Sequence, residues 1–280
     1  MTNNISVIIV TYFTTDVLFD CIKSCKNMNG IEEIIVVNNG NPPVDLAKLK
    51  DLHKKGVIKL IDGNGNIGFG KACNIGSKSS KGKYQLFINP DCYTDNSDFA
   101  VKLRDVLESN PQYWFATSLI LNSDGTIQQT CRRNLMTPLN ALSQSIGLKK
   151  LGVEEMNRDV SEIENLPEIS DLEVFSGALF FCEREKYERI GGFSEEYFLH
   201  VEDMDICRKI HNKGGKICFV KSVSLHHALS TSLVANKFLE LHKAKGFIIY
   251  FRKYYWLCRL PILSQLLSLA IWARYYIKIR

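Results

Sequence analysis

Several common signatures are missing from this 280-residue chain, and their absence excludes whole classes of protein. The nine cysteines include no CxxC pair, and there is no HExxH motif or Cys/His cluster, which argues against a zinc site. The sequence MTNN leads directly into ISVIIV without the basic flank of a signal peptide, so we expect no export and reduced thiols. No internal repeat and no low-complexity segment occurs. We therefore expect a cytoplasmic protein built around one large domain.

Acidic residues are absent from one end of the chain, and this locates the excess of positive charge. The net charge is +5, but residues 241–280 hold eight Lys and Arg and no Asp or Glu. Subtracting eight from +5 leaves −3 for residues 1–240, so the main domain has no general nucleic-acid-binding character. We predict a domain at residues 1–240 and a separate basic, aromatic, helical segment at residues 241–280.

The segment 241–280 lacks a run long and apolar enough to span a bilayer comfortably. Only 14 residues separate Arg259 from Arg274, and Pro261 and three polar residues interrupt them. Aromatic and basic residues alternate in FIIYFRKYYWLCR and ARYYIKIR, a pattern typical of helices that lie on an anionic membrane surface. The alternative is a helix buried against the main domain or against a second copy of the chain.

Apolar, β-branched runs alternate with helical patterns in the first part of the chain. The runs are ISVIIV, EEIIVV, VIKLI and YQLFI, and helices are expected near residues 15–28, 44–54 and 69–80. Continuous apolar strands separated by helices are typical of a mostly parallel sheet covered on both faces. Ligands bind beyond the carboxyl ends of such strands, so VTYF, NNGNPP, DGNGNIGFG and NPDCYT should line one cleft.

The glycine-rich stretch at residues 63–76, GNGNIGFGKACNIG, surrounds the start of a predicted helix. Glycines let the backbone approach a nucleotide closely, and free N–H groups at a helix start favour an anion. The stretch does not match GxGxxG, which argues against a dinucleotide fold. A glycine-rich loop without a ligand is the structural alternative.

The middle of the chain has weaker patterns. A hairpin is expected at LILNSDGTIQ, where Asp124 and Gly125 favour a turn. The region from Pro138 to Ser170 is expected to be rich in loops, with one short helix. Two further strands are expected at EVFSGALFF and KICFVKSVSL.

Asp91 follows the strand YQLFI at the motif NPD. Because Pro90 removes a ladder donor, the carboxylate is presented at the sheet edge. An acid there could hold Mg²⁺ or Mn²⁺ between two phosphates. The structural alternative is a turn aspartate that caps the next helix.

Glu202 and Asp203 fall in the predicted first turn of a helix. The helix dipole stabilises anions there, and it would keep Asp203 ionised as a general base. Acids also collect at helix starts for structural reasons, so capping is the alternative. Further along, Asp205 and Arg208 are expected to form an ion pair on the helix surface.

Two pairs of basic residues have both a functional and a structural interpretation. His226 and His227 follow a strand and could complete a metal shell or contact phosphate, or they could be polar loop residues. Arg132 and Arg133 could grip a phosphate in a bidentate manner, or they could form a solvated basic turn.

Taken in order, seven segments resemble the motifs of family 2 glycosyltransferases, most closely those of the rhamnosyltransferase-like branch: VIIVTY, VVNNGN, NIGFGKACNIG, LFINPD, FSGALFF, IGGFSEEYFLHVEDMDICRKI and HHALSTS. The resemblance covers residues 5 to about 255. It implies an inverting enzyme of the GT-A fold, an α/β architecture with a Rossmann-like, mostly parallel sheet flanked by helices. Residues 1–240 would then be the catalytic domain, followed by the membrane-associating helical segment.

The resemblance also implies roles for individual residues. Asp203 matches the catalytic base and Glu202 an acceptor contact, while Asp91 and His227 match the ligands of Mg²⁺ or Mn²⁺, with His226 as the runner-up. The positions that match nucleotide contacts are Thr11, Tyr12, Asn38, Asn39, Gly68, Asn74 and Asn89. This chain departs from the family in two ways: the family often has Asp in place of Asn38, and it carries two acids in the triplet that ends at Asp91.

The implied reaction is transfer of a sugar from a nucleotide sugar to a saccharide or lipid-linked acceptor in bacterial surface polysaccharide synthesis. The first expectation for the donor is dTDP-rhamnose, with galactose, galactofuranose, glucose and N-acetylglucosamine from UDP donors as alternatives. A sugar nucleotidyltransferase would place a basic GxG-type loop where VTYFTTD stands. An inactive nucleotide-sugar-binding scaffold would not need the intact acidic pair. We expect a peripheral protein at the inner face of the membrane, with homo-oligomerisation left open.

Overall fold

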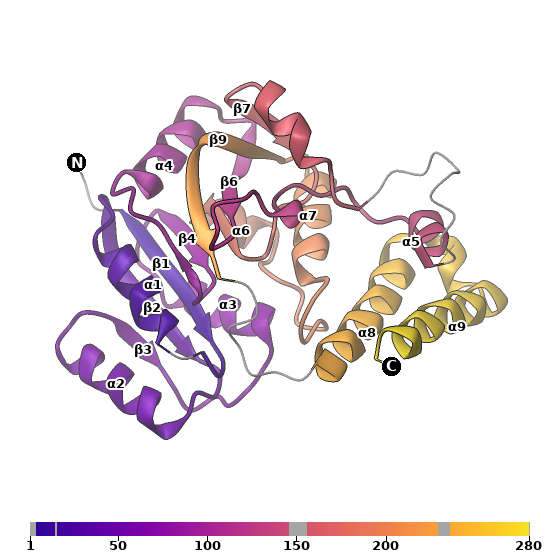
Figure 1. Cartoon of the computed structure of the whole chain (residues 1–280), viewed down its shortest axis with the longest axis horizontal. Helices are drawn as coiled ribbons and strands as arrows, with labels where there is room; N and C mark the ends of the chain where they lie inside the picture. Colours follow the sequence, from indigo (N-terminus) through magenta and orange to yellow (C-terminus); the bar gives the residue numbers. More distant parts are fainter. Residues whose placement is uncertain (1–3, 15, 146–155, 229–235, 280) are drawn as a thin grey trace.

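The computed structural model describes residues 4–14, 16–145, 156–228 and 236–279. These residues form one nine-stranded sheet with helices packed on it, and the C-terminal helices lie together at one side of the molecule (Figure 1).

The first half of the chain alternates strands and helices as predicted. Its elements are β1 (Ile5–Thr11), α1 (Val17–Lys26), β2 (Ile31–Asn38), α2 (Pro43–Lys54), β3 (Lys59–Ile61), α3 (Phe69–Lys78) and β4 (Tyr84–Ile88). The four strands are parallel, in the order β3-β2-β1-β4. All seven residues of β1 are buried, because both faces of the sheet are covered. Gly76 lets α3 approach the sheet, since a Cβ there would lie 2.6 Å from the Cγ2 atom of Ile8.

The second half adds strands that run in both directions. Its elements are β5 (Cys92–Tyr93), α4 (Phe99–Ser109), β6 (Tyr113–Leu121), α5 (Pro138–Ser145), β7 (Ile169–Leu172), β8 (Leu179–Glu183), α6 (Arg184–Arg189), α7 (Glu202–Asn212) and β9 (Lys216–His227). The sheet continues from β4 as β8-β6-β9-β5, with β7 also paired to β9. Within the described residues, only β6 and β9 pair in parallel here, and the other four pairs are antiparallel.

The prediction of a mostly parallel sheet is therefore wrong for this half, and the sheet is mixed. A continuous apolar run records burial on both faces of a strand, but it does not record the strand's direction. The expected strand EVFSGALFF is also shorter than predicted, since only Leu179–Glu183 is a strand. The expected hairpin is reduced to a turn at Asp124 and Gly125 closed by a single bridge between Leu121 and Ile127.

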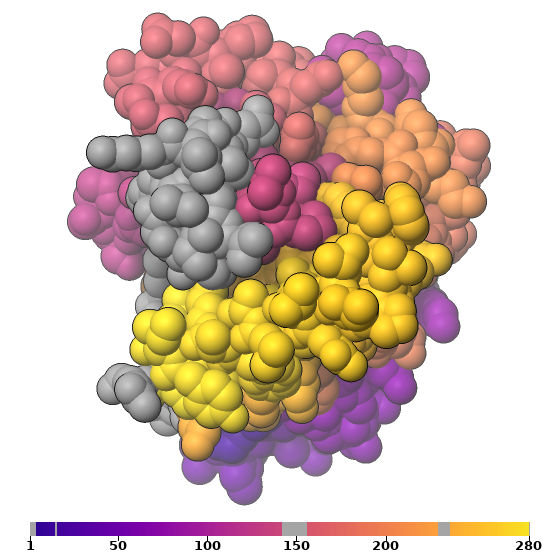
Figure 2. All heavy atoms as spheres, turned by 90° about the vertical axis from the view of Figure 1, so that its right-hand side faces the viewer, coloured from indigo at the N-terminus to yellow at the C-terminus, as the bar shows by residue number. Residues whose placement is uncertain are grey.

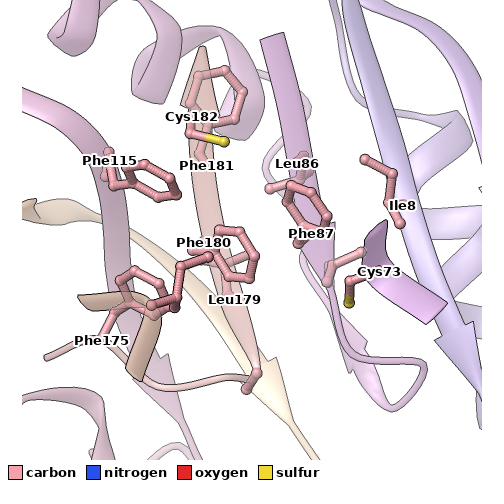
Figure 3. Close-up of a cluster of buried hydrophobic side chains, with 14 of the residues drawn as sticks. Ile8, Cys73, Leu86, Phe87, Phe115, Phe175, Leu179, Phe180, Phe181 and Cys182 are labelled. Atoms are coloured by element: carbon pink, nitrogen blue, oxygen red, sulfur yellow. The ribbon is translucent and has the colours of Figure 1, made fainter. Parts of the chain in front are cut away.

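Stacked phenylalanines join the two halves of the sheet. Phe87 of β4 lies opposite Phe180 of β8, and their ring centroids are 4.3 Å apart. Phe175 stacks on Phe180 in turn, with centroids 4.8 Å apart, and Phe115 of β6 closes the group (Figure 3). Burying aromatic area at this seam holds the antiparallel half against the parallel half.

The C-terminal helices are α8 (Asn236–Tyr254) and α9 (Pro261–Lys278), joined by a 3-10 turn at Trp256–Arg259. Tyr250 and Phe251 of α8 are fully buried, so this helix belongs to the body of the protein. The domain division predicted at residue 240 falls inside α8 and stays a prediction. None of the helices in the described parts of the chain combines the length and apolar character needed to cross a bilayer.

A buried carboxylate fastens α8 to the body. Asp205 accepts hydrogen bonds from the hydroxyls of Ser194, Tyr197 and Tyr254, and it pairs with Lys253 of α8 at 2.9 Å. The predicted surface ion pair with Arg208 is therefore wrong. Asp205 faces inward, and the Arg208 guanidinium lies 5.7 Å from the ring centroids of Tyr254 and Tyr255.

Candidate active site

The pairing of β5 with β9 brings Asp91 beside His227. Cys92 lies opposite His227 in the register, and the Oδ1 atom of Asp91 is 3.2 Å from the Nε2 atom of His227. Both side chains are about nine-tenths buried, at 12% and 10% exposure. His226 points to the other face of the strand, where it stacks on Tyr93. The structure thus places His227, not His226, next to the strand-end acid.

Gln128 contacts the ring nitrogen of His227 that does not face Asp91. Its Oε1 atom lies 3.1 Å from the Nδ1 atom of His227, and its Nε2 atom donates to the backbone carbonyl of the same histidine. Since the amide oxygen can only accept, Nδ1 is the donor in this contact, and Nε2 is the ring nitrogen that faces Asp91. Sequence reasoning missed Gln128, because nothing near residue 128 marks a partner 99 positions away.

The donor atoms at this edge fit a divalent cation. Ligand atoms of Asp91, Cys92 and His227 lie within 4.8 Å of one another. Burial raises the pKa of the Cys92 thiol well above its usual value, so Cys92 stays protonated and is a poor ligand. A carboxylate oxygen and an imidazole nitrogen remain, and these suit Mn²⁺ or Mg²⁺ when phosphate oxygens complete the shell.

Asp203 lies at the start of α7, as predicted, and is paired with Arg133. The Nη2 atom of Arg133 is 2.5 Å from the Oδ2 atom of Asp203, and it also donates to the carbonyl of Phe175. Burial by itself would raise the pKa of Asp203, but the Arg133 guanidinium and the backbone N–H of Met204 hold it below the usual 3.8. Asp203 is therefore ionised at neutral pH.

The two arginines are not the solvated basic turn that the sequence also allowed. Arg133 is buried against Asp203, and Arg132 is buried with its guanidinium 5.7 Å from the ring centroid of Phe219. A bidentate grip on a phosphate stays a prediction for these arginines, since Nη2 of Arg133 binds Asp203 while Nε of Arg133 has no partner among the described residues.

Glu202 has the opposite electrostatic character to its neighbour. Burial, with the charge of Asp203, raises the pKa of Glu202 to about 8, so this carboxyl is largely protonated near neutral pH. Its Oε2 atom is buried and has no hydrogen-bond partner among the described residues. A buried polar atom without a partner is costly, and a ligand hydroxyl would satisfy it.

One cavity of about 340 Å³ joins these groups, and its walls include Asn89, His227, Arg133, Glu202 and Asp203. The strand-end pair of Asp91 and His227, through His227, and the acid at the start of α7 therefore face the same space.

The turn that leads into α7 is strained and is covered by α8. His200 and Val201 have φ angles of 66° and 71°, in the left-handed region that non-glycine residues rarely occupy. Gly246 of α8 packs on this turn, since a Cβ there would lie 2.9 Å from Val201 and 3.0 Å from the carbonyl of His200. Packing from α8 thus helps to fix where Glu202 and Asp203 point.

Polar side chains at the carboxyl ends of β1 and β2 form a connected network. Asn38 accepts from both the backbone and the side chain of Asn41, and Asn41 also hydrogen-bonds the buried hydroxyl of Thr11. The Nδ2 atom of Asn38 donates to Asp62 at 2.8 Å, and this bond lowers the pKa of Asp62. Asp62, which sequence reasoning missed, thus supplies a carboxylate near the position where the family often has one.

The remaining predicted nucleotide contacts shape the loop beside this network. Asn39 donates to Asn66 and to the carbonyl of Gly68. Gly68 has a φ of 88°, and a Cβ there would lie 2.6 Å from the carbonyl of Phe198. The side chain of Asn74 forms hydrogen bonds with the hydroxyl of Tyr187 and with the backbone N–H and carbonyl of residue 193. These side chains hold loops in place, and direct contact with a nucleotide stays a prediction for them.

Tyr12 and Asn89 are more accessible. The ring of Tyr12 is partly exposed beside Gly40, whose Cβ would lie 3.3 Å from it. Asn89 lines the cavity and is fixed through its backbone N–H, which donates to the carbonyl of Ala178. Both lie at strand ends, where the fold leaves room for a ligand.

The sheet and its flanking helices have the GT-A-like fold seen in solved glycosyltransferases. The structure aligns with GalNAc-T7, solved with UDP, GalNAc and Mn²⁺, at a TM-score of 0.68 and 17% identity, covering 90% of this chain and 48% of that one. It also aligns with the mannosyltransferase PcManGT from Pyrobaculum calidifontis, solved with GDP-Man and Mn²⁺, at a TM-score of 0.61 and 14% identity, covering 96% and 69%. At such identities the likeness concerns the fold.

The chain belongs to glycosyl transferase family 2, a family of sugar-transferring enzymes, whose model matches residues 6–153. A second model, the N-terminal domain of galactosyltransferase, matches residues 160–232. Similar proteins include the low-salt glycan biosynthesis hexosyltransferase Agl10 of Haloferax volcanii, 24% identical over 74% of this chain, and the rhamnosyltransferase WbbL of Escherichia coli K12, 25% identical over 74%. The chain spans 61% of the length of the first and 78% of the second.

Proposed function

We propose that this protein transfers a hexose from a nucleotide sugar to a hydroxyl group of an acceptor, with inversion at the anomeric carbon. The observation that supports this most directly is the shared cavity, where ionised Asp203 faces the strand-end group that contains His227. A base on one side and a phosphate-binding site on the other are what a single in-line displacement requires.

In the proposed reaction, the acceptor hydroxyl gives its proton to Asp203 as its oxygen forms a bond to the anomeric carbon. The bond from that carbon to the diphosphate breaks, and its electron pair leaves with the nucleoside diphosphate. Asp91 and His227 would hold a divalent cation, which neutralises charge on the phosphates when bound. Arg133 orients Asp203, and protonated Glu202 is available to hydrogen-bond the acceptor.

The names of the similar proteins favour some donor sugars over others. WbbL is named a rhamnosyltransferase and Agl10 a hexosyltransferase of glycan biosynthesis, and this favours a hexose that enters a surface polysaccharide. We propose dTDP-rhamnose as the first donor to test. Donors with UDP or GDP are the alternatives, since the structural neighbours hold those nucleotides.

A thermal-shift screen of nucleotide sugars, with and without Mn²⁺, tests the donor and the metal together. A donor at about 100 times its Kd should stabilise the fold by about 2.7 kcal/mol, which is roughly a 5 °C rise in Tm for a chain of this size. The part of that rise that depends on Mn²⁺ should disappear in Asp91→Ala and persist in Asp51→Ala, an exposed helical aspartate. If no nucleotide sugar raises Tm, the proposed activity is wrong.

We also propose that α9 and the turn before it rest on an anionic membrane surface. Large apolar side chains are exposed along this segment, led by Trp256, Ile262, Leu266 and Leu269 at 57–73% exposure. The helices α8 and α9 (yellow) cover a large part of one outer face of the molecule (Figure 2). The basic residues of the segment can meet lipid headgroups while the apolar side chains enter the interface.

Flotation with anionic liposomes tests the membrane contact. We expect the full chain to float with the vesicles, and a variant with Ile262→Ser, Leu266→Ser and Leu269→Ser to stay largely in the soluble fraction, because these three side chains lie on one side of α9. Val44→Ser on α2 is the matched control, since Val44 is 68% exposed but far from this segment in sequence. Equal flotation of the triple variant and the wild type would rule the contact out.

A further inference from the structure

Lys243 of α8 lies in the wall of the catalytic cavity. The cavity that holds Arg133, Glu202 and Asp203 also includes Lys243 and Phe247. The same two residues line a second, smaller cavity of about 40 Å³ between α5, α8 and α9. Lys243 therefore stands where the catalytic cavity meets the space between the C-terminal helices, although the sequence assigned it to a tail outside the catalytic domain.

In the described parts of the chain no carboxylate forms an ion pair with Lys243, and Glu240, which also lines the smaller cavity, is paired with Lys278. The ammonium also makes no hydrogen bond within those parts of the chain, while Asp203 is paired with Arg133. Burial, together with the positive charges of Lys278, Arg274 and Arg133, lowers the pKa of Lys243, against the opposing effect of Glu240. An anion that enters this space would be stabilised by the ammonium.

Arg274 of α9 reaches the smaller cavity from the opposite wall. It lines that cavity with Lys243, and within the described residues its guanidinium has no hydrogen-bond or ion-pair partner. An ammonium and a guanidinium that flank one narrow space suit a phosphate group, which both bind through charge-assisted hydrogen bonds.

An apolar groove continues along α9 from this cationic pair. Leu263 and Leu267 of α9 line a cavity of about 570 Å³ together with Trp256 and Tyr255, and Ile271 and Arg274 follow at helical spacing in the smaller cavity. One side of α9 thus runs from an apolar groove to two cations at the edge of the catalytic cavity. An amphiphile that ends in a phosphate group would match this surface, with its apolar chain in the groove and its phosphate at the two cations.

We propose that Lys243 and Arg274 bind a phosphate group of the acceptor, whose apolar chain lies along α9 and whose sugar reaches Asp203. This rests on the proposed glycosyl transfer and adds the chemical class of the acceptor. The donor diphosphate is assigned above to Asp91 and His227 beside Asn89, whereas Arg274 lines the smaller cavity and not the one that holds His227, so we assign the cationic pair to the other substrate.

Binding titrations with two probes separate the sources of phosphate. Dodecyl phosphate, below its micelle concentration, stands for the acceptor, and dTDP or UDP with Mn²⁺ stands for the donor product. Lys243→Gln should weaken dodecyl phosphate binding by about tenfold or more, as expected for loss of a charged hydrogen bond, and leave the affinity for the nucleoside diphosphates unchanged. Lys245→Gln, an exposed lysine on the same helix, should change neither affinity.

Arg274→Gln provides a second variant in case Lys243→Gln alters folding, which the Tm of each variant reports. Loss of nucleoside diphosphate binding with intact dodecyl phosphate binding would assign Lys243 to the donor and overturn the proposal. Unchanged affinity for dodecyl phosphate in both variants would also overturn it. Neither readout needs turnover, so a failure here is distinct from a failure of the proposed transfer reaction.

Discussion

The Asp203→Asn variant is expected to lose about 10²–10⁴-fold in kcat while its affinity for the nucleotide-sugar donor stays close to that of the wild type. An amide cannot accept the proton of the acceptor hydroxyl, so the loss falls on the chemical step. Asparagine can still accept a hydrogen bond from Arg133, and this keeps the local geometry. The measurement is initial-rate kinetics with the donor and metal found by thermal shift.

Asp171→Asn is a matched control for this experiment. Asp171 is also an ion-paired aspartate, bound to Lys216 at 2.9 Å, but its side chain is 60% exposed and it does not line the cavity. Its turnover should be normal. Near-normal transfer by Asp203→Asn would mean that another group removes the proton, and the role given to Asp203 would be wrong.

The Glu202→Gln variant is expected to gain stability relative to the wild type as the pH rises from 5 to 8. The pKa of Glu202 is about 8 in the folded protein and about 4.5 when unfolded, so the folded state holds a proton that the unfolded state releases across this range. The stability contributed by this raised pKa is fully present below pH 4.5 and is lost as the pH rises through 8. The loss has an upper limit of about 1.4 kcal/mol per pH unit.

Tm measured from pH 5 to pH 9 checks this prediction. Asp203, whose pKa lies below its usual value, is ionised throughout that range and does not add to the slope. A buried glutamine can lower Tm by a constant amount, so the evidence is the change of the difference with pH. Glu185→Gln, at an exposed position, should follow the wild type. A difference independent of pH would show that Glu202 ionises normally in the folded state.

Much of the first half of the fold could be predicted from the sequence. Its parallel strands are short, continuous apolar runs, which are typical of strands buried on both faces of a sheet. The direction of β8 could not be predicted, because apolar residues such as Phe180 and Phe181, both fully buried, indicate that a strand is covered but not which way it runs. Strand direction follows from the path of the chain before the strand, and the loop at residues 173–178 has no periodic pattern to report it.

The candidate site, too, could be predicted only in part from the sequence. Asp91, His227, Glu202 and Asp203 belong to ordered motifs, so roles could be predicted for them from a resemblance, and these roles stay predictions. Their partners could not be inferred in this way. Arg133 lies 70 residues from Asp203, and Lys243 stands in a segment whose composition suggested membrane contact or packing against the main domain, but no part in the site. Side chains that act across such separations become visible only when helices and strands are placed in space.

The close fit of Gly246 over the left-handed turn at His200 and Val201 has a consequence for anyone who shortens this protein. The composition of the segment after residue 240 suggests an appendage that could be removed. However, helix α8 forms part of the cavity wall and packs on the backbone turn that precedes Asp203. Trimming the chain there would remove Lys243 and Phe247 from the cavity wall and leave the left-handed turn without the helix that packs on it.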